Sequence, residues 1–595
     1  MDKVKKFFGM YVSDGEPIPD FDKAAVSEMF METQGLDLKK MAAAYSGLAT
    51  RAKMIHPDYL EGKKQHKYIE QMSQLYGSPY RGLLSNSVSF FLGFGPLALF
   101  GPTLPKSLST LEKMILISTP SVTGSLLRLP GGAMTDLKGG FYGTFFMLWS
   151  AVIGLTILSL LIMLAPNEYG IVSVTYWLKF FAGLLSGCGI AVFPIGIANT
   201  AFHFPRKDAG KFVNIFAGIG NLGPAFFSAF IPVLMQEFGI VAAHWICMAS
   251  LFFGALFVMF TFTPSMFHQF TARGFSKDNA YKVANWLGQE LIPINNFPDN
   301  AICKGKVNEN LVIQFLRITW DSIYLIRIYT NLTFVIAYIC CFGGYLYFTS
   351  TLPIFWRDHH GLIKTYAGYL TMGYSAGASI GRAVAGGYVD KLDSRTGGLA
   401  TTIVALTVNI IGILPMVFIP SGADNGLWII PAAIGTAFLS AGTAVANAAV
   451  FKAIPYYMPD DVGKVGGLVG GIGATGGWIF PILSGIFALI LSFVITGEEN
   501  APKRQAMSYL VVIPLTLVAI VMLCVLIFLK REAILNWSPE GDAAAFKKHN
   551  EDTGGIDADF NKQGDAESAS DSTIELNNVE VKDDEKKNQE EELEE

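Results

Sequence analysis

The segment SVTGSLLRLP, residues Ser121–Pro130, carries one arginine in a largely apolar stretch that ends near Asp136. The segment ASIGR, residues Ala378–Arg382, has the same relation to Asp390. In both places the arginine precedes the aspartate by eight residues, with a glycine halfway between them. At 1.5 Å per helical residue, eight residues place the arginine about 12 Å inside the helix end. That is near the middle of a ~30 Å hydrocarbon core, so the two segments predict buried arginines at equal depth.

The two arginine segments belong to a longer internal repeat. They lie 254 residues apart, and the glycines of 218–223 recur in 471–476 at an offset of 253. The dipeptide Ala198–Asn199 recurs as Ala446–Asn447 at an offset of 248. Three matches in the same order predict a duplicated unit. Two halves of this kind that face each other form a transporter architecture, with the binding site at their interface.

The composition predicts a chain that lies mostly in a membrane. Of the 595 residues, 51% are hydrophobic and only 16% are charged, against about 25% charged in soluble domains. A helix that crosses the bilayer needs about 20 apolar residues. Twelve stretches meet this requirement, six on each side of a polar break: 85–105, 113–134, 141–165, 172–200, 211–236, 241–262, 329–354, 365–388, 398–420, 426–455, 463–494 and 507–530. We therefore predict an all-α membrane protein with 12 transmembrane helices in two pseudo-symmetric six-helix bundles.

The predicted organisation has five parts. They are an N-terminal tail (1–84), a six-helix bundle (85–262), a central loop (263–328), a second six-helix bundle (329–530) and an acidic, disordered tail (531–595). The last 55 residues hold 18 acidic and six basic side chains, so the net charge of −5 hides a body of about +7. An even number of spans in each half places both tails and the loop on one side. The acidic tail is either a solvated segment or a docking site for a partner protein.

The two arginines predict a negatively charged ligand. An ionisable residue inside a span is costly and is a functional candidate. No Asp or Glu falls in the core of any predicted span, so Arg128 and Arg382 would repel each other unless an anion lies between them. The planar fork of arginine matches two oxygens of a flat oxyanion. The alternative is that each arginine is structural and bonds backbone carbonyls.

Two further features accompany the arginines. Tyr338 and Phe342 are four residues apart and share a helix face, where they either line a site or simply pack. The glycine runs 218–223 and 466–477 let helices approach closely and slide. No strand precedes the first run, which argues against a dinucleotide-binding loop. Because the spans lack carboxylates and His203 and His244 lie near span ends, proton symport and substrate exchange both stay open.

Several functional classes are not supported by the sequence. Five of the six cysteines lie in apolar runs without metal-ligand or disulfide spacing. No basic stripe with interleaved aromatics indicates nucleic-acid binding. No nucleophile set or cofactor motif indicates an enzyme, and we expect no cofactor.

Several segments together resemble the nitrate/nitrite porters of the major facilitator superfamily. Those that carry the resemblance are Phe90–Phe94 with Leu104–Lys106, Thr123–Pro130 with Thr135–Asp136, Ile197–Pro205 with Ala217–Gly223, and Ala446–Pro455 with Gly466–Gly477. The resemblance covers the chain from about Phe90 to Leu529. It implies the major facilitator fold, a place in the plasma membrane with both termini cytoplasmic, and a role in nitrate transport.

The resemblance also implies which residues bind substrate. Arg128 and Arg382 would be the binding pair, Tyr338 and Phe342 a seventh-span aromatic site, and Phe193 the opposing ring. The remaining implied residues are Gly218, Gly220, Asn221 and Gly223 in a first glycine signature, Gly470, Gly473, Gly476 and Gly477 in a second, and Asn199 and Asn447. The substrate would be nitrate or nitrite, carried by alternating access, with a proton or a counter-anion as the coupled species.

The chain also departs from the family pattern. Phe216 stands where the family often has Asn, Ala446 and Ala448 replace glycines, and Trp478 replaces the usual Phe. The long tails and central loop are not typical of short bacterial members. Two alternatives therefore remain: a carrier for another small anion such as an organic acid, and a transporter-like sensor whose tails signal.

Overall fold

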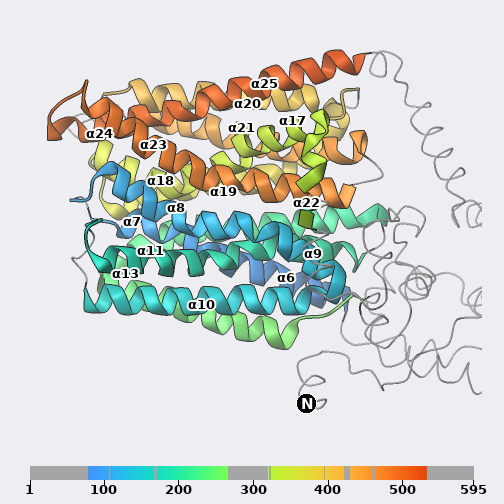
Figure 1. The fold of residues 1–595 in the computed structure, drawn as a ribbon, viewed down its shortest axis with the longest axis horizontal. Helices are drawn as coiled ribbons and strands as arrows, with labels where there is room; N and C mark the ends of the chain where they lie inside the picture. Colours follow the sequence, from blue (N-terminus) through green and yellow to red (C-terminus); the bar gives the residue numbers. More distant parts are fainter. Residues whose placement is uncertain are drawn as a thin grey trace, which may run out of the picture. The chain divides into compact units, whose positions relative to one another are not determined.

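The computed structural model describes residues 78–531 except for 106, 166–169, 205, 266–267, 269–318, 321–322, 394, 421–428 and 459–461. Within these residues all regular elements are helices and no strand occurs, which confirms the predicted all-α class (Figure 1). The acidic tail beyond Arg531, most of the N-terminal tail and most of the central loop lie outside the described residues.

The first half contains six predicted spans. Its helices are α6 (Pro79–Phe94), η2 (Gly95–Ala98), α7 (Phe100–Thr103), α8 (Thr110–Leu126), α9 (Arg128–Lys138), α10 (Gly140–Leu164), α11 (Val174–Gly187), η3 (Cys188–Ala191), α12 (Val192–Ala201) and α13 (Arg206–Thr261). The spans predicted at 211–236 and 241–262 are two helices that follow each other directly and together carry the label α13. They meet at Gly239, where φ is 83°, a conformation that glycine adopts without steric cost.

The second half begins after the central loop. Its helices are η6 (Leu325–Arg327), α17 (Tyr329–Tyr338), η7 (Ile339–Gly343), α18 (Gly344–Ile354), η8 (Phe355–His359), α19 (Lys364–Leu392), α20 (Leu399–Phe418), α21 (Ile429–Tyr457), α22 (Val462–Ile472), η11 (Gly473–Thr475), α23 (Gly476–Ser492), η12 (Glu498–Asn500), α24 (Ala501–Met507), η13 (Ser508–Val511) and α25 (Val512–Leu529). The seventh span runs to His359, five residues beyond its predicted end.

Nine helical stretches among the described residues are long and apolar enough to cross a membrane. One of them, Phe212–Thr261, has 50 residues and would extend about 75 Å if straight, enough for two crossings. The two arginine-bearing stretches, Thr110–Lys138 and Lys364–Leu392, are not among the nine. The count of twelve spans therefore stays a prediction.

Local sequence signals explain several helix starts. Ser109 and Glu112 form a capping box at the start of α8: the Ser109 hydroxyl accepts from the Glu112 N–H at 3.3 Å, and the Glu112 carboxylate accepts from the Ser109 N–H at 3.0 Å. Ser78 caps α6, and Pro79 occupies its first position. Gly139, with φ of 80°, separates α9 from α10. These signals explain where helices α6, α8 and α10 begin.

The turn between α19 and α20 is held by Asp393. Its carboxylate accepts from the Thr396 side chain and from the Thr401 N–H at 2.9 Å. Burial alone would raise the pKa of Asp393, but these hydrogen bonds outweigh it and hold the pKa below the ordinary value. Lys452 of α21 donates to the Val389 carbonyl at 2.8 Å, so α21 is tied to the end of α19.

Two helix pairs make the most extensive contact between the two halves. The blue-to-green helices gather on one side of Figure 1 and the yellow-to-red helices on the other. Across this boundary α13 packs against α19, and α8 packs against α23. The largest buried cluster draws on both halves, with Phe90, Phe193 and Phe216 from the first and Tyr338 and Phe342 from the second. The centre of the molecule is therefore an aromatic seam.

Candidate functional site

Arg128 lies at a break in the second predicted span. Helix α8 ends at Leu126, and α9 begins at Arg128 itself. The side chain is 1% exposed, and its Nη1 donates to the carbonyl of Gly470 in α22 at 3.0 Å. The guanidinium carbon lies 4.7 Å from the ring centre of Phe193 and 4.9 Å from that of Phe342. These rings belong to different halves, so Arg128 sits where the halves meet.

One edge of the Arg128 guanidinium makes no hydrogen bond within the described part of the chain. Its Nε and Nη2 are both buried, and neither has a hydrogen-bond partner among the residues that the structure describes. Nε–H and the adjacent Nη2–H form the side of the fork that binds two oxygens of an oxyanion. A buried donor without a partner costs about 1–3 kcal/mol, and more when it is charged. A flat anion would satisfy both groups at once.

Arg382 approaches the same place from the other half. It lies within α19 and is 7% exposed. Its Nη1 donates to the Tyr338 hydroxyl at 3.3 Å, and its guanidinium carbon lies 5.3 Å from the ring centre of Phe451. The Tyr338 and Phe342 rings stack with centres 5.1 Å apart and planes 9° apart. Because Phe342 contacts Arg128 and Tyr338 contacts Arg382, the stacked pair joins the two arginines.

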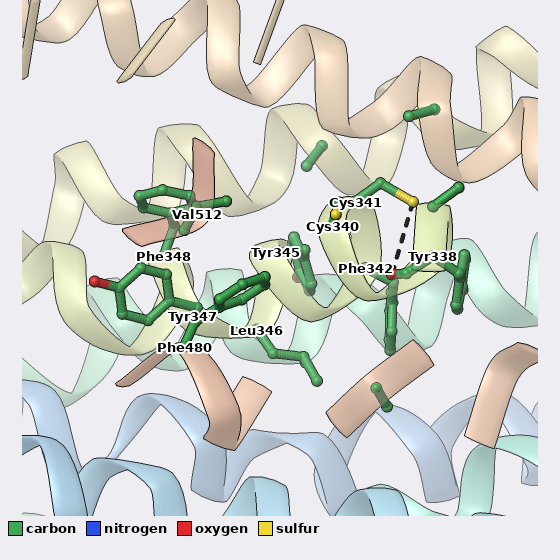
Figure 2. Packing of buried hydrophobic residues seen from close by; sticks show 14 of the residues in the cluster. Tyr338, Cys340, Cys341, Phe342, Tyr345, Leu346, Tyr347, Phe348, Phe480 and Val512 are labelled. Carbon is green, nitrogen blue, oxygen red and sulfur yellow. Dashed lines mark hydrogen bonds between the residues drawn. The ribbon is translucent and has the colours of Figure 1, made fainter. Parts of the chain in front are cut away.

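A π-helical turn positions this pair. Tyr338 ends α17, and Phe342 lies in the π-helix η7 that follows (Figure 2). The Cys341 thiol donates to the Tyr338 carbonyl at 3.8 Å within this turn. Single π turns inside α-helices often mark functional sites. A Cβ on Gly343 would lie 2.6 Å from the Cα of Gly476, so the wide turn packs directly on α23.

The second glycine signature lines the seam. A Cβ on Gly473 would overlap the Tyr338 ring, and one on Gly476 would lie 2.7 Å from the Ile339 carbonyl oxygen. A Cβ on Gly477 would lie 2.7 Å from the Leu346 Cβ and 3.0 Å from the Ser121 hydroxyl oxygen. Gly470 supplies the carbonyl that Arg128 binds. Three of these glycines therefore permit close packing, and Gly470 contributes a polar atom.

The first glycine signature contacts other partners. Gly220 has no room for a Cβ against the Phe90 ring, nor has Gly223 against the Phe91 carbonyl. Gly218 is looser, because its Cβ would lie 3.7 Å from Ala383. These three glycines pack helices and show no contact with either arginine.

Asn221 of the same signature joins the two halves. Its backbone carbonyl accepts from the Tyr345 hydroxyl at 2.9 Å and from the Ser379 hydroxyl at 3.0 Å. Its side-chain oxygen is buried and has no partner within the described part of the chain. Tyr345 also shares a hydrogen bond with Ser375 at 2.7 Å. Tyr345 follows Phe342 by three residues, and the two rings stack with their centres 5.9 Å apart. The hydrogen bonds around Asn221 therefore lie next to the aromatic seam.

The two repeated asparagines have different surroundings. Asn199 donates to the Asn86 side chain at 3.2 Å and to the Thr263 carbonyl at 3.4 Å, so it takes part in packing within the first half. Asn447 is buried, and its side-chain oxygen has no hydrogen-bond partner among the described residues. The structure does not bring Asn199 to the arginines.

Phe451 belongs to the site but is not among the residues predicted from the sequence. Phe451 packs edge-on against Tyr338, with ring centres 5.0 Å apart, in addition to lying near Arg382. It follows Asn447 by four residues and therefore shares its helix face, which is the one clue that could have found it. No ion pair joins a carboxylate to either arginine among the described residues.

A separate cavity of about 560 Å³ lies in the second half. It is bounded by α19 and α21, with Trp356, Tyr374, Gly377, Gly381 and Ser440 among its lining residues. Neither arginine lines it, so it is distinct from the arginine site.

Two helical halves with paired buried arginines at their seam define a membrane carrier rather than an enzyme. The chain belongs to the major facilitator superfamily, whose sequence profile matches residues 83–434 and 334–551. The predicted fold class and superfamily are thereby confirmed, and the chain is a multi-pass membrane transporter.

Similar proteins include several with nitrate or nitrite in their names. A probable nitrate transporter of Staphylococcus epidermidis is 24% identical over 425 residues, which cover 70% of this chain and 90% of the relative. A nitrite extrusion protein of Bacillus subtilis is 26% identical over 392 residues, which cover 65% of this chain and 80% of the relative. A probable nitrate/nitrite antiporter of Thermus thermophilus is 24% identical over 428 residues, which cover 68% of this chain and 84% of the relative.

Solved structures agree on the fold. The Escherichia coli xylose transporter XylE, in a partially occluded inward-open conformation, matches with a TM-score of 0.50 and 13% identity over 74% of this chain and 96% of its own. A bacterial homologue of the human lysosomal transporter Spinster matches with a TM-score of 0.50 and 16% identity. The match covers 78% of this chain and 100% of the homologue.

Proposed function

We propose that this chain carries nitrate or nitrite across a membrane by alternating access, with the anion bound between Arg128 and Arg382. The observation that supports this most is the free Nε/Nη2 edge of Arg128 beside the stacked rings of Phe193 and Phe342. Nitrate and nitrite are flat, singly charged and small, so two adjacent oxygens fit the fork while the face of the ion lies against aromatic rings. The names of the relatives support the same substrates.

The electrostatics favour a single small anion. Both arginines are buried, and no carboxylate among the described residues pairs with either. Two uncompensated guanidiniums in a low-dielectric seam repel each other. One monovalent anion removes most of that repulsion, whereas a larger organic acid would also have to fit its carbon skeleton among rings that already touch.

The topology follows from the resemblance. We propose that the protein lies in the plasma membrane with both termini and the central loop in the cytoplasm. The coupled species is either a proton or a counter-anion, and the tails provide a surface for a partner protein.

The direct test is uptake of labelled nitrate and nitrite into proteoliposomes. Arg128→Ala and Arg382→Ala are each expected to abolish uptake, because each removes one of the two guanidiniums that hold the anion. The matched control is Arg504→Ala: this arginine donates to the Ile495 and Gly497 carbonyls at 2.7 Å, away from the seam. Uptake equal to wild type in both seam variants would refute the two-arginine site.

The same preparation separates nitrate from other anions. Unlabelled nitrate, nitrite, chloride, formate and acetate are added as competitors at equal concentration. Nitrate and nitrite are expected to suppress uptake most strongly. Stronger competition by a carboxylate would favour the organic-acid carrier instead.

A further inference from the structure

The cavity between α19 and α21 opens toward the lipid. Tyr369, Gly373 and Ala437 line it and are exposed. Ile380 and Ile434, each next in sequence to a lining residue, are exposed as well. Large apolar side chains on the exposed face of a membrane-spanning helix contact hydrocarbon. A molecule dissolved in the bilayer can therefore reach the cavity without crossing water.

Small residues form the floor of the cavity. A Cβ on Gly377 would lie 2.6 Å from the Ser440 hydroxyl oxygen, so α19 and α21 touch there. They touch again one turn further on, where a Cβ on Gly381 would lie 2.8 Å from the Ala444 Cβ. A Cβ on Gly373, in contrast, meets no described atom within 4 Å. The missing side chains leave a volume of about 560 Å³, which is typical of small-molecule sites.

The serine and threonine hydroxyls of the lining are already bonded. Thr436 donates to the Ala432 carbonyl and Ser440 to the Tyr374 carbonyl, both at 2.8 Å. Neither hydroxyl has a proton left to donate to a ligand. The walls therefore suit a largely apolar molecule.

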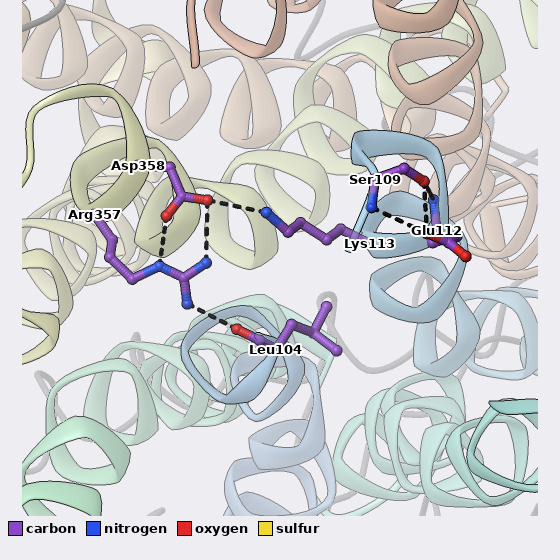
Figure 3. A network of polar contacts seen from close by, with 6 residues as sticks. All are labelled: Leu104, Ser109, Glu112, Lys113, Arg357 and Asp358. Atoms are coloured by element: carbon purple, nitrogen blue, oxygen red, sulfur yellow. Dashed lines mark hydrogen bonds and ion pairs between the residues drawn. The ribbon is translucent and has the colours of Figure 1, made fainter. Parts of the chain in front are cut away.

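Trp356 supplies a free donor at one end of the cavity. It lines the cavity and is 0% exposed, and its Nε1–H has no hydrogen-bond partner among the described residues. A buried donor without a partner is costly, and a ligand with one acceptor would satisfy it. Trp356 directly precedes the paired Arg357 and Asp358 (Figure 3) and lies three residues before His359, where the seventh span ends. The donor is thus close to the membrane surface.

The other end of the cavity reaches toward the middle of the bilayer. Along α19 the lining extends from Tyr369 to Gly381, twelve residues or about 18 Å. Gly381 directly precedes Arg382, the deeply placed arginine of this half. The length is about that of one leaflet, half of a ~30 Å hydrocarbon core. A ligand with one polar group at the surface and an apolar body of this length is a membrane lipid.

The shape of the cavity favours a rigid lipid over a flexible chain. A lipid tail gains no hydrophobic free energy on moving from the bilayer to an apolar protein surface, because both are equally apolar. Ordering a flexible chain also costs conformational entropy. A flat ring system loses little freedom and can lie closely on glycine and alanine residues. Its binding then rests on dispersion contacts and on one hydrogen bond.

We propose that the cavity between α19 and α21 binds a sterol. The sterol hydroxyl oxygen accepts from Trp356 Nε1–H, and the ring system lies over Gly373, Gly377 and Ala437. The site acts on the protein whichever anion is carried.

The bound sterol would also contact the ring stack of the arginine site. Tyr374 lines the cavity, and its ring stacks on Tyr345 with centres 6.1 Å apart. Tyr345 in turn stacks on Phe342, which lies over Arg128. A sterol in the cavity therefore supports, from the lipid side, the same rings that lie beside the proposed anion site.

The test is photolabelling of the full chain in lipid nanodiscs. A cholesterol analogue with a photoactivatable diazirine on its ring system is included in the bilayer, and labelled peptides are identified by mass spectrometry. Label is expected on residues 369–381 of α19 and 433–445 of α21. Unlabelled cholesterol in ten-fold excess should lower this labelling about ten-fold, by mass action.

Matched variants separate the cavity from the general lipid surface. Ala437→Phe fills the cavity and should lower labelling of the two segments at least about five-fold, because the ring system loses its contact surface. Val404→Phe enlarges a side chain of α20 that is 64% exposed and does not line the cavity, and it should leave labelling unchanged. Gly373→Leu fills the same cavity and provides the test if Ala437→Phe fails to fold.

A third variant tests the hydrogen bond. In the wild-type protein, cholesterol should compete about five-fold better than its 3α-hydroxyl epimer, as expected for one net hydrogen bond. Trp356→Phe keeps an aromatic ring but removes the donor, so the preference between the epimers should disappear. An equal preference in both proteins would show that Trp356 does not bind the hydroxyl.

Three results would overturn the sterol site. One is label spread evenly over the lipid-facing helices or not displaced by cholesterol, as expected of bulk lipid. Another is unchanged labelling in both Ala437→Phe and Gly373→Leu. The third is labelling of the two segments by a photoactivatable phosphatidylcholine but not by the sterol, which would assign the cavity to a phospholipid chain. None of these measurements involves nitrate, so failure of the sterol site and failure of the proposed substrate are distinguishable.

Discussion

At the scale of single residues, the two arginines are equivalent in the repeat but not in their surroundings. Arg128 bonds a backbone carbonyl of the opposite half and lies over two rings. Arg382 bonds a tyrosine of its own half at a longer distance. The spacing to the aspartates predicted that both would be buried, but it contained no information on these partners. Gly470 lies 342 residues from Arg128, and no local pattern reports a contact of that range.

This difference predicts unequal effects of lysine substitution. Arg128→Lys removes the free Nε/Nη2 fork and should lower the kcat/KM of nitrate uptake about 100-fold, corresponding to about 3 kcal/mol. Arg382→Lys keeps a cation where the structure shows one Nη1 contact, and its loss should be about ten-fold smaller. Initial rates over a range of nitrate concentrations measure both. Equal losses would show that Arg382 also uses its fork.

At the scale of elements, the sequence predicted spans but not their interruptions. The break at Leu127 and the π turn η7 lie inside predicted spans, and the π turn η8 lies beyond the predicted end of the seventh span. A π turn depends on what packs against it, here Gly343 against Gly476. The periodicity of one segment of sequence does not contain that contact. The i, i+4 relation of Tyr338 and Phe342 nevertheless predicted that they share a face, and their rings do stack.

The glycine-rich eleventh span offers an internal comparison. Gly473→Ala would place a methyl group into the Tyr338 ring, whereas a Cβ on Gly467 meets nothing within 4 Å. We expect Gly473→Ala to abolish transport and lower the melting temperature by several degrees, as overpacking costs about 1–3 kcal/mol. Gly467→Ala should keep transport and gain stability, because alanine favours a helix by about 1 kcal/mol over glycine. Uptake and thermal unfolding in detergent measure both, and a harmless Gly473→Ala would argue against a rigid Tyr338.

At the scale of the whole molecule, the charge of the seam has consequences for coupling. Reorienting the empty carrier moves two buried cations without an anion, whereas the loaded carrier moves them with one compensating charge. The loaded step should therefore be faster. No carboxylate among the described residues pairs with either arginine to take up a proton in place of the anion.

This predicts exchange that exceeds net uptake. Proteoliposomes loaded with unlabelled nitrate should take up labelled nitrate at least ten-fold faster than empty ones, without a pH gradient. Liposomes that contain Arg128→Ala protein serve as the control for leak. Equal rates with and without internal nitrate, together with acceleration by an inward proton gradient, would favour proton symport.

The tail offers a second test at this scale. Both arginines and the aromatic seam lie within the described residues. A chain truncated after Arg531 is therefore expected to transport nitrate at the rate of the full chain, measured by uptake at matched protein density. A truncated chain that keeps transport but loses a cellular response to nitrate would support the sensor alternative.

The contact of Phe342 with Arg128 has a consequence for ancestry. One of the two rings over the arginine of the first half, Phe342, comes from the second half. A six-span unit on its own would carry one arginine but not the ring that the other half contributes. If such a unit preceded the duplication, it could have held an anion between two arginines only as a pair of identical chains. The present chain would then preserve, in one polypeptide, a site that first existed between two molecules.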